Sequence, residues 1–353
     1  LILGFGIIGA LMGYVASIAL ACLLGILLLT FRIYRPLDHS NGDPESFSND
    51  LKMLMGYGLP LYASVLIGGL TLQYRNILLS VFTSNYEVGN FQAAMNFNAI
   101  MNSISIPVAT MLLPAFSKME ERKEMIKELF RMSLKYTAIV ILPITILLMV
   151  YAEEAVRIIY GAGYELAPSL LILIMVAYFL VGLGSNTLGS FFGGIGETRI
   201  NLKITIVSSI TLIVLAPLFG YSLKINGIIL TLLISSLIGT IYGLHIARKS
   251  FEIKIDPEKM IRIYLVSLVS ALPILAVKEL LAYSDIVMVM LGMAIYFASY
   301  LLMIPLTGVM TRTELKEIEK IVEKITLLNY LSKPILYCEE RIFEAFPRTS
   351  LAE

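Results

Sequence analysis

The 353-residue sequence has few charged residues and few cysteines. Only 15% of its residues are Asp, Glu, Lys or Arg, whereas a soluble protein typically has about 25%. Its two cysteines, Cys22 and Cys338, lie far apart and form neither a disulfide framework nor a metal-binding spacing. The net charge of +1 provides no bulk attraction for nucleic acid. We therefore expect no nucleic-acid partner and no disulfide-stabilised domain.

The sequence also lacks the residue groupings of an enzyme active site. His39 and His245 are its only histidines, and both fall outside the apolar segments or at their edges. No acidic residue lies well inside such a segment, and no glycine-rich phosphate loop follows a strand. Glu153-Glu154 resembles the acidic pair of a membrane glycosyltransferase, although the solvated start of a loop is the simpler interpretation. We expect no enzyme activity, no cofactor and no metal.

Long apolar segments dominate the sequence. Apolar residues make up 58% of it, and the mean hydropathy is +0.82. About 20 apolar residues are needed to cross roughly 30 Å of hydrocarbon, and such segments recur along most of the chain. We predict an all-α integral membrane protein of about nine transmembrane helices. The predicted spans are Gly6–Phe31, Met53–Phe82, Val88–Phe116, Thr137–Tyr151, Ala167–Phe192, Ile200–Leu218, Gly227–Ala247, Ile261–Val277 and Ile286–Met310.

Prolines and glycines inside these spans predict bends and close packing. The second and third spans are longer than a perpendicular crossing needs, and Pro60 and Pro107 could bend them. In the fifth span, Gly189 and Gly193 have a small-xxx-small spacing that lets helix backbones approach closely. Packing is the first expectation for these glycines, and a bend used in gating is the alternative.

Basic residues are divided unequally between alternate connections. Of 27 Lys and Arg residues, 23 lie beside or within connections that follow odd-numbered spans, or in the C-terminal tail. Arg157, Lys224 and Lys278 lie in the other connections, and Arg75 lies inside a span. Cytoplasmic loops carry such an excess. This pattern predicts a multi-pass protein of the cell (cytoplasmic) membrane with a cytoplasmic C-terminus.

The two ends of the chain differ in character. The chain begins inside an apolar segment at Leu1, so we expect further N-terminal sequence before it. After the last span, Thr311 and Glu314 have capping-box spacing, and apolar residues then recur at helical period. We expect an amphipathic helix on the inner membrane surface or packed on the cytoplasmic loops. Residues 118–135 have a similar mixed character.

Arg75 is the strongest functional candidate. A cation at the centre of a spanning helix costs about 2.5–3.5 kcal/mol, so such residues usually face a partner or a wet cavity. Amides in hydrocarbon also need partners. The predicted substrate-binding residues are Arg75, Tyr74 and Gln73 of the second span, with Gln92, Asn96, Asn98 and Asn102 of the third span.

One cavity lined by Arg75 and these amides would satisfy all of them. Because it would hold a cation and no carboxylate, it would suit an anionic, phosphate-bearing or sugar-like ligand. Tyr74 and Tyr178 could stack on sugar rings. In the alternative arrangement, Arg75 extends to the outer headgroups and the amides only hold helices together.

Several motifs in this order resemble the polysaccharide transporter family, the Wzx-type flippases of lipid-linked oligosaccharides. This family belongs to the multidrug/oligosaccharidyl-lipid/polysaccharide exporter superfamily. The resemblance covers residues 5–305. Its motifs are Gly58-Leu59-Pro60, Arg75-Asn76-Ile77-Leu78-Leu79, Glu87-Val88-Gly89-Asn90-Phe91-Gln92-Ala93-Ala94, Leu112-Leu113-Pro114-Ala115-Phe116-Ser117, Tyr160-Gly161-Ala162-Gly163-Tyr164, Gly196-Glu197-Thr198-Arg199 and Gly227-Ile228-Ile229.

The resemblance implies two six-helix lobes that alternately open a central cavity. Residues 1–31 would be the last helix of a truncated N-terminal lobe, and residues 51–247 the C-terminal lobe. Residues 260–310 would be two additional helices, and residues 311–353 a cytoplasmic amphipathic tail. Family members often have Asp-Arg where this chain has Tyr74-Arg75, which places acid-dependent coupling there in doubt.

The resemblance also implies a function, which is the flipping of a polyprenyl-(di)phosphate-linked oligosaccharide for glycan biosynthesis. The implied partners are this lipid-linked sugar, membrane lipids and glycan-assembly enzymes. A multidrug exporter of the same superfamily is the first alternative, although it would need a membrane carboxylate. A membrane glycosyltransferase or polymerase is the second alternative.

Overall fold

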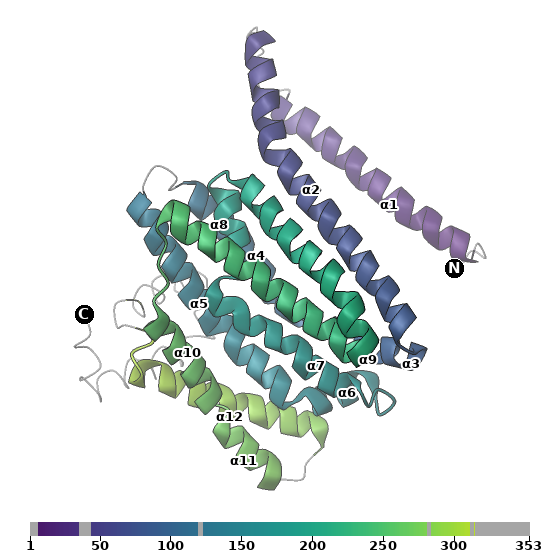
Figure 1. The fold of residues 1–353 in the computed structure, drawn as a ribbon, viewed down its shortest axis with the longest axis vertical. Helices are drawn as coiled ribbons and strands as arrows, with labels where there is room; N and C mark the ends of the chain where they lie inside the picture. The colour runs from purple at the N-terminus through teal and green to yellow at the C-terminus, as the bar shows by residue number, and fades with distance from the viewer. Residues whose placement is uncertain (1–5, 35–43, 119–122, 281–283, 311–313, 315–353) are drawn as a thin grey trace. The chain divides into compact units, whose positions relative to one another are not determined.

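The computed structural model describes residues 6–34, 44–118, 123–280, 284–310 and 314, and all regular structure within them is helical (Figure 1). The chain forms two compact units, Leu1–Gly56 and Tyr57–Glu353. The helices are α1 Gly6–Leu28, a π-helical segment Leu29–Tyr34, α2 Pro44–Phe82, α3 Asn85–Asn96, α4 Asn98–Ser117, α5 Lys123–Val150, α6 Ala152–Tyr160, α7 Ala167–Met175, a 3-10 helix Val176–Leu183, α8 Leu188–Gly194, α9 Thr198–Phe251, α10 Pro257–Val269, α11 Leu272–Leu280 and α12 Asp285–Leu306.

Long apolar helices confirm that this is an all-α, multi-pass membrane protein. Within the described residues, seven helices are long and apolar enough to cross a membrane, or up to eight if one bent pair counts as a single span. The bent pair is the predicted fifth span. The predicted sixth and seventh spans both fall in α9. The total of nine spans therefore stays a prediction.

Helix α9 is folded back on itself as two antiparallel arms (Figure 1). Its helical dihedral angles are interrupted at Lys224, where φ is 51° and ψ is −128°. Glycines let the arms approach. A Cβ atom added at Gly239 would lie 2.0 Å from Ser208 Oγ, and one at Gly243 would lie 2.7 Å from Ile204 Cδ1. The small residues of the second arm thus set the spacing between the two arms.

The fifth span is broken. It runs through α7 and the 3-10 helix to Gly184, which has a φ of 92°, and resumes as α8 at an angle of 44°. Glycine is favoured at Gly184 because it lacks the Cβ that destabilises this left-handed conformation. The close packing expected around Gly189 and Gly193 centres instead on Gly194, where an added Cβ would lie 2.6 Å from Leu113 O. In the third span, the helix is interrupted at Phe97, between α3 and α4, whereas the proline expected to bend it, Pro107, lies inside α4.

Aromatic rings hold the helices together near the α8 end of the second unit. The Phe191 ring contacts one ring from each of three other helices at centroid distances of 5.1–5.4 Å. Its partners, Phe116, Phe130 and Phe251, come from α4, α5 and α9. Edge-to-face contacts of this kind are favourable beyond the apolar area that they bury. This cluster fixes the end of the wall formed by α4 and α8.

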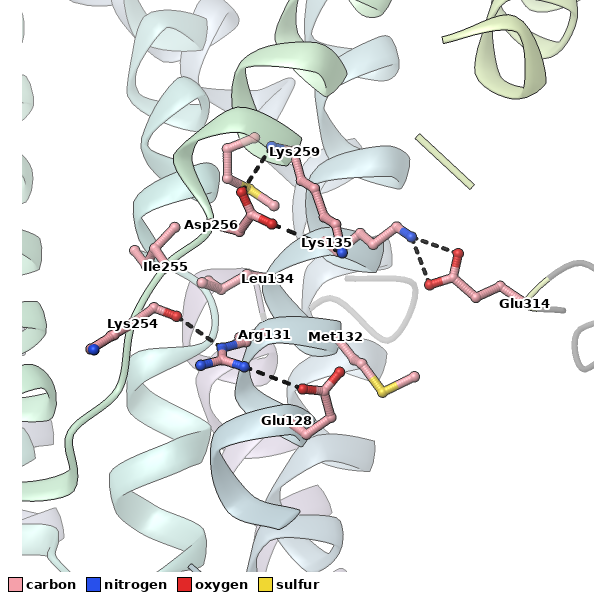
Figure 2. A pocket seen from close by; sticks show the side chains of 11 residues that line it. Glu128, Arg131, Met132, Leu134, Lys135, Lys254, Ile255, Asp256, Lys259 and Glu314 are labelled. Atoms are coloured by element: carbon pink, nitrogen blue, oxygen red, sulfur yellow. Dashed lines mark hydrogen bonds and ion pairs between the residues drawn. The ribbon is translucent and has the colours of Figure 1, made fainter. Parts of the chain in front are cut away.

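Charged residues that were predicted to lie on one side of the membrane lie together. Lys135 Nζ lies 2.6 Å from Glu314, and Arg131 Nε donates to Lys254 O at 3.1 Å (Figure 2). These contacts join the connections that follow the predicted third, seventh and ninth spans. Which side is the cytoplasm stays a prediction. Apart from Glu314, the predicted amphipathic tail 311–353 lies outside the described residues.

At the opposite end, ion pairs join α6 to α11 and α12. Arg157 donates two hydrogen bonds, of 2.6 and 2.9 Å, to Asp285. This hydrogen bonding raises the pKa of the Arg157 guanidinium, which therefore stays charged. Lys278 Nζ lies 2.8 Å from the buried Glu154. Toward the middle of the protein, the Tyr300 hydroxyl donates to Ile139 O at 2.8 Å. The last two helices are thus fastened to α5 and α6.

Candidate functional site

A cavity of about 680 Å³ lies among α2, α3, α4, the broken fifth span and the second arm of α9. Its apolar lining comes mainly from the fifth span and from α9. Polar side chains project from every one of these walls. They are Arg75, Gln92, Asn96, Asn98, Asn102, Tyr178, Ser185, Asn186 and Ser236.

Arg75 is the charged residue of this lining, and it is only 7% exposed. Its guanidinium carbon lies 5.5 Å from the centre of the Phe91 ring, and Nη2 donates to Asn76 Oδ1 at 3.0 Å. Arg75 Nε is buried and has no hydrogen-bond partner within the described part of the chain. A buried donor without a partner is costly. Arg75 therefore retains an unused donor at the wall of the cavity.

The predicted amides of the third span are brought together along one wall. Gln92 donates to Asn96 at 3.3 Å, and Asn96 in turn donates to the Tyr160 hydroxyl at 2.9 Å. Asn98 accepts a hydrogen bond from the Tyr178 hydroxyl at 3.0 Å. At 1.5 Å of rise per residue, the row from Gln92 to Asn102 extends about 15 Å. The row provides donors and acceptors over that length.

Gln73 and Tyr74 lie elsewhere. Neither is among the residues that line the cavity. Gln73 is exposed, and the Tyr74 hydroxyl lies 3.3 Å from Ile213 O on the first arm of α9. Successive helix positions differ by about 100°, so only part of the Gln73–Arg75 motif can face one cavity. Their role in substrate binding stays a prediction.

Three further polar residues line the cavity although they are not among the predicted site residues, namely Ser185, Asn186 and Ser236. Ser185 and Asn186 follow Gly184 at the break in the fifth span, where they face the cavity. The signal that could have identified them is a polar pair after a glycine inside an otherwise apolar span. Ser236 belongs to the Ser235-Ser236 pair in the second arm of α9, and serines in a spanning helix are equally typical of interhelical packing.

The charge carried by the described lining of the cavity is positive. Among the described residues that line it there is a guanidinium and no carboxylate. Guanidinium binds phosphate and carboxylate through parallel hydrogen bonds, and neutral amides and hydroxyls bind sugar hydroxyl groups. An organic cation would meet repulsion from Arg75 with no compensating acid in this lining. The arrangement suits a ligand with an anionic group and a neutral polar part.

Comparisons with known proteins agree with this description. Residues 2–168 match a family model described as "Polysaccharide biosynthesis protein". The chain is 26% identical over 289 residues to an uncharacterised membrane protein of Methanocaldococcus jannaschii, covering 79% of this chain and 54% of that protein. It is 19% identical over 229 residues to Agl15 of Haloferax volcanii, a probable low-salt glycan biosynthesis flippase. This match covers 64% of this chain and 48% of Agl15. The chain thus spans about half the length of these relatives.

Solved structures share the fold. The lipid II flippase MurJ, in an inward closed conformation, matches with a TM-score of 0.59 and 18% identity over 80% of this chain and 59% of that chain. An outward-facing multidrug resistance transporter of the MATE family matches with a TM-score of 0.52 and 15% identity over 83% and 77%. The family match over residues 2–168, which is just under half of the chain, and the glycan flippase relative together support a place for the chain in the polysaccharide transporter family, and the shared fold agrees with it.

Proposed function

We propose that this protein flips a polyprenyl-(di)phosphate-linked oligosaccharide across the cell membrane for glycan biosynthesis. The observation that carries the proposal is Arg75, a buried guanidinium with an unpaired Nε, in a cavity that also holds a row of amides. The family and the glycan flippase relative support the same class of cargo.

The cavity residues would have two roles. Arg75 would contact the phosphate or an acidic sugar, because its guanidinium forms charge-assisted hydrogen bonds with such groups. Gln92, Asn96, Asn98 and Asn102 would contact sugar hydroxyl groups. The lipid tail would remain in the bilayer while the polar headgroup crosses.

We further propose that residues 51–247 form the C-terminal lobe of an alternating-access transporter, with residues 1–31 contributed to an N-terminal lobe. Residues 260–310 would be the additional helices, and residues 311–353 a cytoplasmic tail. The grouping of the Lys135–Glu314 and Arg131–Lys254 contacts at one end fits this orientation. Rocking of the two lobes would expose the cavity to each side in turn.

Transport in proteoliposomes tests the role of Arg75. The full-length protein is reconstituted with a fluorescent polyprenyl-diphosphate oligosaccharide, and its appearance in the opposite leaflet is measured. We expect Arg75→Ala to lower the transport rate about tenfold or more, because a hydrogen bond to a charged group contributes about 1.5–3 kcal/mol. Arg75→Lys should lower the transport rate less than Arg75→Ala does, because lysine keeps the positive charge but not the bidentate geometry of the guanidinium.

Ser80→Ala is the matched control. Ser80 is exposed on the same helix, and its hydroxyl bonds to Ile77 O within that helix. It should transport at the wild-type rate. Wild-type transport by Arg75→Ala would refute the assigned role, and uptake of organic cations in place of the glycolipid would favour a multidrug exporter.

A further inference from the structure

The wall of the cavity contains a ladder of hydrogen bonds between α4 and the broken fifth span. In each bond the two partners are 80 or 81 residues apart, so the two segments run parallel in a fixed register. The bonds run from the Tyr178 hydroxyl to Asn98 Oδ1 (3.0 Å), from Asn186 Nδ2 to Ser105 Oγ (3.0 Å) and from Ser190 Oγ to Ala109 O (2.9 Å).

Only part of this ladder faces the cavity. Tyr178, Asn98 and Asn186 line it, whereas Ser190 and Ala109 do not. Ser190 is 8% exposed and bonds to a backbone carbonyl, which is typical of a helix-to-helix contact. The ladder is therefore structural at its Ser190 end and accessible to a ligand at Tyr178 and Asn186.

The accessible amides have unused hydrogen-bonding capacity. Asn98 Nδ2 donates to Met95 Sδ at 3.4 Å, and a thioether is a weak acceptor. Asn186 Oδ1 accepts a long hydrogen bond, 3.4 Å, from Ser185 Oγ. An amide has two donor hydrogens and two acceptor lone pairs. Both residues can therefore bind hydroxyl groups without first losing a strong bond.

This accessible part of the ladder is separate from the cation. Arg75 lies against Phe91 in α3. From the helical rise, Asn98 lies about 10 Å and Ser105 about 20 Å further along this pair of helices. A ligand that touches both regions must have an anion at one end and neutral polar groups along its length.

We propose that Tyr178 and Asn186, with Asn98, form a neutral-sugar subsite in which glycan hydroxyl groups bind the donors and acceptors that the ladder leaves unused. Tyr178 belongs to the 3-10 helix and Asn186 to the turn that follows Gly184, so a bound sugar bridges the first half of the broken span and the break itself. The inference rests on the proposed function and assigns specificity for the glycan to residues other than Arg75.

Binding of two lipids by the full-length protein in detergent tests this subsite. One probe is a polyprenyl diphosphate without sugar, and the other is the same diphosphate bearing a neutral tetrasaccharide. We expect Tyr178→Phe and Asn186→Ala each to weaken binding of the glycosylated lipid about threefold to tenfold, the effect of one lost hydrogen bond. Binding of the sugar-free lipid should stay within about twofold of wild type.

Two further variants separate the possible outcomes. Ser190→Ala removes the ladder bond outside the cavity and should leave binding of both lipids unchanged, and Arg75→Ala should weaken both. One outcome is that Tyr178→Phe and Asn186→Ala leave glycolipid binding intact while Arg75→Ala weakens the binding of both lipids. The proposed sugar subsite is then refuted and the proposed function stands. If Tyr178→Phe and Asn186→Ala weaken the binding of both lipids equally and lower the melting temperature, these side chains have a structural role and the sugar subsite is again refuted. Failure of the wild-type protein to bind either lipid overturns both proposals.

Discussion

At the scale of single residues, Arg75 combines burial with incomplete hydrogen bonding. Its contacts with Phe91 and Asn76 engage part of the guanidinium, and Nε has no partner within the described residues. Inside a membrane, a buried donor of this kind is retained at a cost in stability. The cost is understandable if Arg75 meets an anion during the transport cycle.

Two glycines of α8, Gly189 and Gly194, differ in how closely other atoms surround them. An added Cβ at Gly194 would lie 2.6 Å from Leu113 O and 2.7 Å from Phe116 Cβ, whereas one at Gly189 would have nothing within 4 Å. We expect Gly194→Ala to destabilise the protein by about 1–3 kcal/mol through overpacking. Gly189→Ala, the matched control, should be neutral or slightly stabilising. Thermal unfolding in detergent measures both, and equal melting temperatures would contradict the packing described for Gly194.

At the scale of helices, breaks occur where the cavity needs polar groups. The fifth span departs from α-helical geometry from Val176 onward and turns at Gly184, which brings Ser185 and Asn186 to the lining. Irregular backbone at membrane depth is tolerated where it lines a cavity or is buried in protein. The break therefore contributes to the site and also bends the helix.

The attachment of α11 to α6 yields an element-scale prediction. Glu154 has a side chain only 7% exposed and pairs with Lys278, whose side chain is 31% exposed. We expect Glu154→Gln to destabilise the protein by about 1–2 kcal/mol, because Lys278 loses its carboxylate partner in a partly buried site and keeps only the neutral Val150 carbonyl as an acceptor. Glu153→Gln is the matched control, since Glu153 is exposed and lies 3.8 Å from Arg157. Limited proteolysis and melting temperature measure the difference, and similar behaviour of the two variants would show that the pair does not hold α11.

At the scale of the whole molecule, the charge distribution predicts orientation. We expect a cysteine at Ser250, in the predicted cytoplasmic connection, to react with an impermeant reagent only after cells are permeabilised. A cysteine at Ala162, in an opposite connection, should react in intact cells. Both positions are exposed, and Cys22 and Cys338 are first replaced by serine. The reverse pattern of labelling would invert the topology.

Much of this architecture could be predicted from the sequence, because span length and apolar composition are dictated by the bilayer. Arg75 and the four amides could be identified because polar groups are costly in hydrocarbon. The break at Gly184 could not be located, because glycine in a span permits either packing or a bend. Gln73 and Tyr74 were grouped with Arg75 by sequence proximity, while the cavity is reached by only one face of α2.

Ligand protection of a cavity residue tests the central claim most directly. In a cysteine-free background, Asn102→Cys is labelled with a water-soluble maleimide in the presence and absence of the polyprenyl-diphosphate oligosaccharide. We expect the glycolipid to slow labelling several-fold, and Arg75→Ala to abolish this protection while leaving labelling itself intact. Ser80→Cys, on the exposed side of α2, should not be protected. Two results would contradict the claim that Arg75 binds the glycolipid in a water-accessible cavity. One is an Asn102→Cys side chain that the water-soluble maleimide does not label, and the other is protection that persists in Arg75→Ala.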